Sequence, residues 1–272
     1  MSKSTRSRYA LALAATLTRS TPRVRGLGRA CQYIAARATN RWGDHSITMR
    51  VSGNLMILDP TERVDRSLIF VPQWTDTGER RACRRILRRG DAAVDVGANI
   101  GSYALLFASL VGADGRVAAI EALPEAAEIL RRNIRLNGFE NISLVEAGVS
   151  DRREPATIWM QRKGNRGAST FLPREMDVTG FEAATVDCLP LSDITDGRVR
   201  LLKLDIEGLE RRVMDQFLSD VQARPDYILT EQWTSEDDAE GVVFLLTRRG
   251  YLVEQRFGSN YLLRWPSAST TS

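Results

Sequence analysis

The chain has 272 residues, of which 43% are hydrophobic and 26% charged, a composition typical of a globular protein with one large or two small domains. Its three cysteines are scattered and lack metal-ligand spacing, which indicates a reducing compartment, and its single histidine excludes a zinc site built on several histidines. The net charge of +4 is uneven, because residues 1–43 hold nine Lys and Arg and no acidic residue, so the remainder is net acidic.

The basic segment, residues 1–45, is predicted to be a largely helical extension. Its apolar run, Tyr9–Thr18, spans ten residues, about half of the roughly 20 that a helix needs to cross a bilayer. We therefore expect no transmembrane segment and a cytoplasmic protein. The Arg- and Ser-rich composition would also suit a secretory or mitochondrial targeting segment, or a helix that caps the domain or contacts an anionic surface.

Strand-like patterns begin after this segment. Ile47–Val51 and Leu55–Leu58 flank Ser52-Gly53-Asn54, a turn sequence, and so predict a β-hairpin. A helix is then predicted from Asp76 to Leu87. Glu79 lies in its first turn, where the helix dipole favours an acidic side chain.

The central pattern is a strand, a glycine-rich turn and a helix. Ala92–Val96 is too short for a helix and suits a buried strand, whereas Ser102–Ala108 is a strong helix former. Between them, Gly97 is expected to allow a sharp turn and close approach of a ligand, and Gly101 to let the helix pack tightly against the strand. The free backbone N–H groups and positive dipole end of that helix would face the ligand.

The charge of Asp95 indicates which ligand this turn accepts. It stands two positions before Gly97, at the tip of the strand. A carboxylate at about 4 Å from a diphosphate would be repelled by on the order of 4 kcal/mol at an effective dielectric near 20. A ligand with an ammonium or sulfonium group would be attracted instead. The sequence therefore favours S-adenosylmethionine over a dinucleotide.

The next two strands each end at an acidic residue. Arg116–Ile120 precedes Glu121, which follows Gly97 by 24 residues and can accept both hydroxyls of a ribose. After a helix, Ile142–Val145 precedes Glu146. By its order along the sheet, the Glu146 carboxylate is expected near the adenine amine, unless it is only a solvated acid of the rim.

Residues 161–180 are predicted to form a long loop between the strands Ala156–Met160 and Ala184–Asp187. The loop contains four Lys and Arg, three glycines and few apolar residues. Long loops of this kind are often functional. It is either a lid whose cations face an anionic group of the acceptor or a solvated loop.

Two further main strands, Val199–Ile206 and Pro225–Glu231, carry the remaining acids. Asp205 and Glu207 follow at the carboxyl end of the first, beside the crevice where the sheet order reverses and where ligands of open α/β sheets bind. Glu231 ends the second. Asp205 could alternatively cap the helix that follows.

The C-terminal part completes one domain. Glu236–Arg249 is predicted to be the last helix, and Tyr251–Glu254 with Tyr261–Arg264 an antiparallel pair. No linker or repeat divides residues 46–264, so these are expected to form a single domain. Residues 265–272, rich in Ser and Thr, are expected to be a disordered tail.

Two stretches resemble one known family. Asp-Val-Gly-Ala-Asn-Ile-Gly, residues 95–101, is similar to the first motif of the FkbM-type class I methyltransferases, and residues 203–210, Lys-Leu-Asp-Ile-Glu-Gly-Leu-Glu, are similar to its second signature. The resemblance covers roughly residues 60–264. It implies an α/β fold with a Rossmann-like, seven-stranded mixed sheet, S-adenosylmethionine as the cofactor, and O-methylation of sugar or polyketide-like hydroxyls.

The resemblance also implies roles for individual residues. Glu79 would lie near the methionine end of the cofactor, and an acid at Glu231 is shared with the family. With the turn residues Asp95, Gly97, Asn99 and Gly101, and with Glu121, Glu146 and Asp205, Glu79 makes up the expected cofactor site.

An aliphatic hydroxyl acceptor must lose its proton during or after attack. Asp205, Glu207 and Glu231 are the expected proton acceptors, and burial among like charges would raise their pKa values and make them better bases. His45 is a rival base, and Lys203 could pair with one of the acids. The acids could also bind a divalent ion, but no ligand set is definite enough to assign a metal site.

Two other functions remain open at this stage. The basic N-terminus suits an RNA-binding methyltransferase, although the acidic body lacks a basic stripe and its cations lack interleaved aromatics, so no nucleic acid partner is expected. An NAD-dependent dehydrogenase is disfavoured by Asp95 and Asn99. The expected partner is a small-molecule or glycan hydroxyl.

Overall fold

The computed structural model describes residues 15–16, 18–19, 46–161, 169, 171, 179, 181–206, 208–232 and 238–266. Most of the predicted N-terminal extension, most of the predicted lid, His45, Glu207 and nearly all of the predicted tail lie outside these residues. None of the described helices is both long enough and apolar enough to cross a bilayer.

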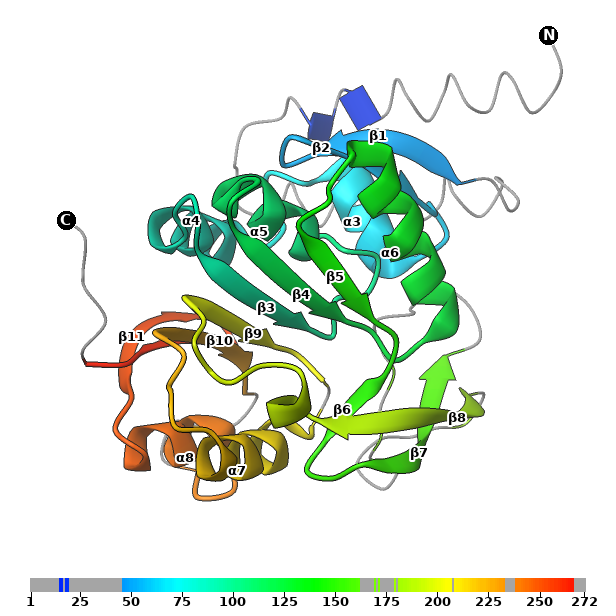
Figure 1. The fold of residues 1–272 in the computed structure, drawn as a ribbon. Coiled ribbons are helices and arrows are strands. Elements are labelled where there is room, and N and C mark those ends of the chain that lie inside the picture. Colours follow the sequence, from blue (N-terminus) through cyan, green and yellow to red (C-terminus); the bar gives the residue numbers. More distant parts are fainter. Residues whose placement is uncertain are drawn as a thin grey trace, which may run out of the picture.

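A seven-stranded sheet forms the centre of the molecule (Figure 1). Its order is β11 (Leu252–Phe257), β12 (Asn260–Arg264), β10 (Tyr227–Glu231), β9 (Leu201–Leu204), β3 (Ala92–Val96), β4 (Arg116–Ile120) and β5 (Ile142–Val145). Neighbouring strands from β10 to β5 run parallel, and β12 pairs antiparallel with both β10 and β11. The predicted α/β fold with a seven-stranded mixed sheet is confirmed.

Helices cover both faces of the sheet, and each face has its own hydrophobic core. On one face lie α4 (Thr77–Ile86), α5 (Ala104–Val111) and α6 (Pro124–Asn137), and on the other α7 (Glu210–Asp220) and α8 (Val242–Arg248) (Figure 1). Successive side chains of β3 and β9 therefore point alternately into the two cores. This is why the sequences of both strands are nearly continuous apolar runs. Burial on both faces fixes the strand ends that carry the acidic residues.

The hairpin of β1 (Ile47–Val51) and β2 (Asn54–Leu58) was predicted, but the helix after it was not. Residues 63–70 form α3 (Arg63–Phe70), which packs with the hairpin in a third core. Two asparagines of α6 hold the hairpin: the Asn133 and Asn137 side chains accept hydrogen bonds from the backbone N–H groups of β2 at 2.7 and 2.8 Å. The hairpin is thus part of the domain.

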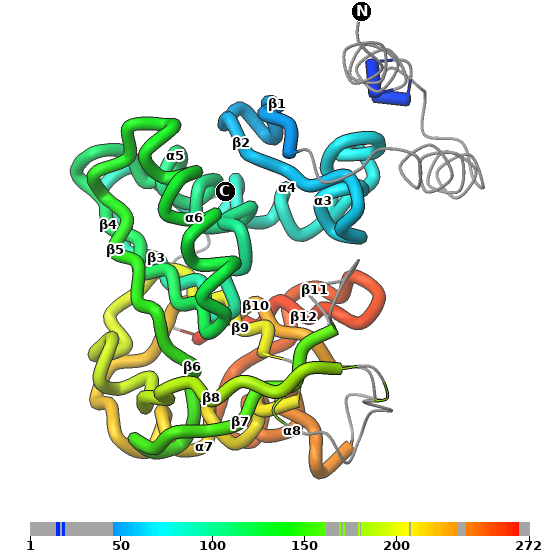
Figure 2. The backbone as a smooth tube through the Cα atoms, turned by 90° about the vertical axis from the view of Figure 1, so that its right-hand side faces the viewer, coloured from blue at the N-terminus to red at the C-terminus, as the bar shows by residue number. Residues whose placement is uncertain are grey.

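A small second sheet has the order β6 (Gly148–Ser150), β8 (Phe181–Pro190) and β7 (Glu154–Gln161). The strand predicted at 156–160 is present but longer, and the short strand predicted at 184–187 is the middle of the ten-residue β8. This sheet and the β1-β2 hairpin lie at opposite ends of the molecule (Figure 2). The carboxyl ends of the main strands open between them.

Candidate cofactor-binding site

The turn between β3 and α5 is held against the next strand. The backbone N–H groups of Gly97 and Ala98 both donate to the carbonyl oxygen of Ile120, at 3.0 and 2.9 Å. Gly97 and Gly101 have φ angles of 77° and 95°, and Asn99, at 49°, is one of three described non-glycine residues with a positive φ. A positive φ favours glycine, as at positions 97 and 101, and is tolerated by asparagine, as at position 99.

Each glycine of the turn is required by a close neighbour. Gly97 lies against the backbone of Asp205, and a Cβ on Gly101 would stand 2.4 Å from the Leu130 side chain on α6. Gly101 was predicted to let the helix after the turn pack tightly against the strand; the structure gives it a further close neighbour, the Leu130 side chain of α6. The glycines bring β3, β9 and α6 close together, and the turn backbone lines a hollow above them.

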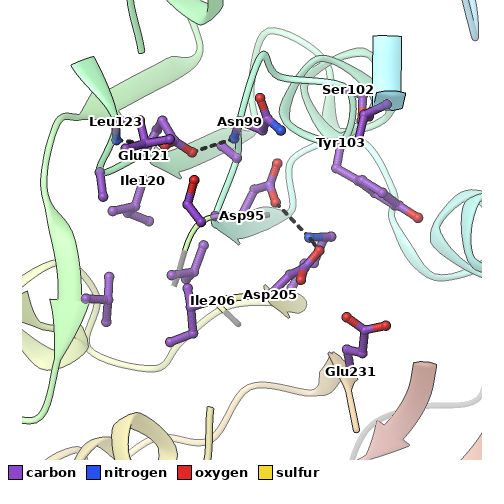
Figure 3. A pocket seen from close by; sticks show the side chains of 18 of the residues that line it. Asp95, Asn99, Ser102, Tyr103, Ile120, Glu121, Leu123, Asp205, Ile206 and Glu231 are labelled. Carbon is purple, nitrogen blue, oxygen red and sulfur yellow. Dashed lines mark hydrogen bonds and ion pairs between the residues drawn. The ribbon is translucent and has the colours of Figure 1, made fainter. Parts of the chain in front are cut away.

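Glu121, at the tip of β4, is fixed by the turn it serves (Figure 3). Its two carboxylate oxygens accept hydrogen bonds from the backbone N–H groups of Asn99 and Leu123, at 2.7 and 2.8 Å. Burial raises the pKa of Glu121 to about 6, although these two donors favour the charged form. Glu121 also lines the hollow, and a carboxylate can accept more hydrogen bonds than these, as contact with two vicinal hydroxyls requires.

Asp95, at the tip of β3, is a buried carboxylate with unmet hydrogen-bonding capacity. Its side chain is 1% exposed, and neither oxygen has a hydrogen-bond partner among the described residues. Burial raises the pKa of Asp95, while the ammonium of Lys203, 3.8 Å away, opposes that shift. A buried acceptor of this kind is costly unless a ligand supplies a donor or a positive charge.

Lys203 connects Asp95 with Asp205. Its Nζ donates a 3.0 Å hydrogen bond to Asp205, which confirms that it pairs with an acid. Burial alone would lower the pKa of Lys203, but the carboxylates of Asp205 and Asp95 raise it, so the lysine stays charged. The site therefore contains a fixed cation between two acids, and one cation cannot neutralise both.

Tyr103, in the first turn after the motif, is held between two cations. The Arg80 guanidinium lies 4.6 Å and the Lys203 ammonium 5.1 Å from its ring centroid. Arg80 also donates to the backbone oxygen of Ser102 at 3.2 Å. Burial raises the pKa of Tyr103 well above its ordinary value, so its hydroxyl stays protonated and can donate. Tyr103 lines the hollow and was not singled out by the sequence.

The acids of β9 and β10 face the same hollow as the motif, whose volume is about 570 Å³ (Figure 3). Asp205 follows β9, and Glu231 ends β10, the adjacent strand. The Ser259 hydroxyl donates to Glu231 at 2.8 Å. Burial raises the pKa of Glu231, the Ser259 hydrogen bond opposes this shift, and the charge of Asp205 adds to it. The structure thus brings together five of the predicted residues that carry a polar side chain: Asp95, Asn99, Glu121, Asp205 and Glu231.

Three predicted cofactor residues do not line this hollow: Gly101, which packs against Leu130, and the acids Glu79 and Glu146. Glu79 is buried in the first turn of α4, where its carboxylate accepts a 3.2 Å hydrogen bond from the Asn260 side chain. Glu146 follows β5 and pairs with Arg131 of α6 at the surface. A contact of any of the three with the cofactor stays a prediction, as do the roles of Glu207, which lies outside the described residues.

The hollow also has walls beyond the predicted cofactor residues. One wall comes from α3 and the turn before α4, including Arg63, Ser67 and Asp76, and the other includes Ile158 of β7 and Phe171. Asp76 has a φ of 47°, a left-handed conformation directly before α4. An acid immediately before a helix is a sequence signal that could have drawn attention to it. The α3 residues had none, because that helix was not predicted.

The fold and this site define a class. A glycine turn after the first main strand, an acid at the tip of the second, and the reversal of strand order between β3 and β9 are the features of a class I S-adenosylmethionine-dependent methyltransferase. Residues 95–253, more than half of the chain, match the family model of the methyltransferase FkbM domain. The chain belongs to this family, and S-adenosylmethionine is its cofactor.

Similar proteins share shorter stretches. The chain is 39% identical over 70 residues to a protein-L-isoaspartate O-methyltransferase of Ignicoccus hospitalis (26% of this chain, 33% of that one) and 36% identical over 69 residues to protein-L-isoaspartate O-methyltransferase 1 of Archaeoglobus fulgidus (25% and 32%). It spans about a third of the length of these relatives.

Solved structures of similar fold include the methyltransferase FkbM from Methylobacillus flagellatus, with 16% identity, a TM-score of 0.44 and coverage of 74% of this chain and 54% of that one. M. jannaschii TYW2 in complex with AdoMet has 15% identity, a TM-score of 0.44 and coverage of 81% and 84%.

Proposed function

We propose that this methyltransferase acts on a hydroxyl oxygen of a small molecule, sugar or polyketide-like acceptor. The observation that carries the proposal is that Asp205 and Glu231, from adjacent strands, line the same hollow as Asp95 and Glu121, which we propose bind the cofactor. Carboxylates beside the reacting group are what a hydroxyl acceptor requires, because its proton has to leave.

The residues present fit the cofactor. Glu121 offers two oxygens to the ribose hydroxyls, and the buried Asp95 carboxylate, which has no hydrogen-bond partner among the described residues, suits a cationic part of the ligand. When bound, S-adenosylmethionine supplies a methyl group already activated for transfer. The protein's task is therefore to align the acceptor oxygen and to exclude water.

Glu231 is the residue we propose as the proton acceptor. Its raised pKa makes it a stronger base than an ordinary glutamate, and Ser259 holds one of its oxygens in place. Asp205 is tied to Lys203 by a 3.0 Å hydrogen bond, which suits a role in orienting the acceptor, with proton transfer as its second possible role. Glu207 remains a third candidate from the sequence.

Two observations support an oxygen acceptor on a substrate that is not a polyanion. The relatives that match by sequence are named O-methyltransferases. In addition, the described lining of the hollow contains one arginine, Arg63, and one lysine, Lys203, which is already paired, against five acids. Such a lining disfavours a polyanionic substrate such as RNA.

The test is to identify the labelled product. Purified full-length protein would be incubated with S-adenosylmethionine carrying a labelled methyl group and with fractionated extract, and the labelled products analysed by mass spectrometry. We expect the label on the oxygen of a small-molecule hydroxyl, and no labelled product with Glu231→Gln. A label found on RNA, on protein or on a nitrogen atom would contradict the proposal.

A further inference from the structure

A second hollow, of about 580 Å³, lies at the opposite edge of the main sheet. It forms where the parallel strands begin, whereas the cofactor hollow lies where they end. The five residues of β3 separate these edges by roughly 16 Å, at about 3.3 Å per residue. Half of the residues around the second hollow are arginines: Arg88, Arg116, Arg198, Arg200 and Arg224. We call it the arginine hollow.

The topology of the sheet gathers these arginines from distant parts of the sequence. Strands β4, β3, β9 and β10 lie side by side in this order in the sheet, and an arginine stands at or shortly before the start of each. Arg116 is the first residue of β4 and pairs in register with Ala92, the first of β3. The backbone N–H of Arg200, just before β9, donates to the carbonyl oxygen of Ala92 at 2.8 Å. The side chains are therefore anchored on the most rigid part of the fold.

The carboxylates around the arginine hollow do not balance its charge. Asp91 and Asp226 are the acids among the described lining residues, and Asp196, beside the hollow, pairs with Arg198 at 2.9 Å, so five arginines and three acids leave a net charge of +2. Asp226 accepts a 2.7 Å hydrogen bond from the Arg200 guanidinium, and the Asp91 carboxylate accepts one, also at 2.7 Å, from the backbone N–H of Arg88. Both carboxylates therefore already accept a hydrogen bond from within the protein.

Two of the arginines form no ion pair with a carboxylate in the described part of the chain. Arg116 is exposed and forms no ion pair or hydrogen bond through its side chain within the described part of the chain. Arg224 donates to backbone carbonyl oxygens, that of Val221 at 3.0 Å among them. Both guanidinium groups retain donors for a ligand, because each carries five N–H groups.

We propose that the arginine hollow binds the diphosphate group of a small molecule. Guanidinium forks match phosphate oxygens in bidentate geometry, and a diphosphate carries enough charge to balance the excess. The volume of about 580 Å³ lies within the range of small-molecule sites, about 300–1,000 Å³. No aromatic side chain is found among the described residues that line it, so it lacks the stacking surfaces with which proteins bind single-stranded nucleic acids.

Calorimetric titration of the full-length protein with inorganic pyrophosphate at low ionic strength tests this site. S-adenosylhomocysteine would be present at saturation, so that the cofactor hollow is occupied. We expect binding of one pyrophosphate per chain, weakened at least about tenfold by Arg116→Glu. Arg198→Glu, a second exposed position of the hollow, should weaken it similarly. Arg132→Glu reverses the charge of an exposed arginine on α6, outside the hollow, and should leave the affinity unchanged.

Titrations with other ligands identify the source of the phosphate, and some of their results would overturn the proposal. A nucleoside diphosphate that binds with the same dependence on Arg116 indicates a nucleotide ligand, and pyrophosphate binding alone indicates the free anion; both support the site. Absence of pyrophosphate binding, or an equal loss with Arg132→Glu, overturns it. Tighter, Arg116-dependent binding of a 20-nucleotide RNA overturns the small-molecule assignment. S-adenosylhomocysteine binding should be unchanged in all three variants, which separates this result from the proposed methyl transfer.

Discussion

Gly97 and Asp205 stand so close that no side chain fits between them: a Cβ on Gly97 would lie 1.9 Å from the backbone carbonyl oxygen of Asp205. The two residues are 108 positions apart in the sequence and end adjacent parallel strands. The contact fixes the separation between the glycine turn and Asp205. The first motif of the family and its second signature thus meet at this contact.

Gly97→Ala should be more destabilising than an ordinary substitution of a glycine with positive φ. Gly138 is the matched control, since it has a φ of 65° and nothing within 4 Å of the added Cβ. Gly138→Ala should cost about 1–2 kcal/mol of unfolding free energy from the left-handed backbone alone. Gly97→Ala should cost about 1–3 kcal/mol more, because backbone must move. Urea unfolding measures both, and equal losses would show that the contact is not tight.

Asp95→Asn should weaken the binding of S-adenosylhomocysteine by about 1–3 kcal/mol, a factor between about 5 and about 150. The amide keeps the shape of the side chain but removes the charge that faces the ligand. Calorimetric titration gives the affinity, and Asp114→Asn, at an exposed turn, serves as the control that should bind normally. Unchanged binding by Asp95→Asn would remove the electrostatic argument for this residue.

Cofactor binding should weaken in acid because of Glu121. Its pKa of about 6 lies above the ordinary value of 4.5, so protonation begins close to neutral pH and converts an acceptor of two hydroxyl groups into a partial donor. The affinity should be constant above about pH 7 and fall by up to about tenfold per pH unit below 6. Glu121→Gln should bind weakly without this dependence, whereas Asp95→Asn should retain it.

Glu231→Gln should reduce turnover by about 100-fold or more at saturating cofactor, while the affinity for S-adenosylhomocysteine stays within about twofold. The raised pKa of Glu231 places the acid limb of the pH–rate profile above the ordinary range of a glutamate, and this limb should disappear in the variant. Ser259→Ala removes a hydrogen bond that favours the charged form, so it should move the limb to higher pH. A limb that does not respond to Ser259→Ala would assign the base elsewhere.

Asp205→Asn should also lower turnover at saturating cofactor, but for a different reason. The carboxylate accepts the hydrogen bond of Lys203, so its loss should disturb the orientation of the acceptor. We therefore expect a higher Michaelis constant for the acceptor together with reduced turnover, and an acid limb that moves to lower pH but is not lost, because the charge of Asp205 contributes to the raised pKa of Glu231. Steady-state kinetics as a function of pH separates this outcome from that of Glu231→Gln. Full activity would remove Asp205 from the reaction.

Local signals were enough to predict the main sheet. The strands at 92–96 and 116–120 have the bounds that their apolar runs indicated. Helix α3 lacked such a signal because it has eight residues and depends on its surroundings: the buried Asp65 carboxylate of its first turn accepts a 2.8 Å hydrogen bond from the backbone N–H of Asp59. The second sheet was not foreseen, since β8 pairs with strands on both sides that lie far from it in sequence.

The acids at the strand ends likewise include some that could be placed from sequence and one whose surroundings could not be foreseen. Asp95, Glu121 and Glu231 could be placed from sequence, because each lies at or next to the carboxyl end of an interior strand and such ends open at one edge of the sheet. Glu146 follows β5, the outermost strand, where Arg131 of a neighbouring helix is within reach. The position of a residue along the chain gives the strand end, but the pairing of its side chain depends on neighbours that only folding brings near.

The last strand of the domain has a consequence for its synthesis. β12 (Asn260–Arg264) lies between β10 and β11, so the strand made last is inserted between two made earlier, and its central residues, Tyr261, Leu262 and Leu263, are at most 1% exposed. Until it leaves the ribosome, β10 presents an open edge and β11 has no partner. The nascent chain should therefore depend on chaperones until residues 260–264 emerge, and a fragment ending with the family match at residue 253 should aggregate.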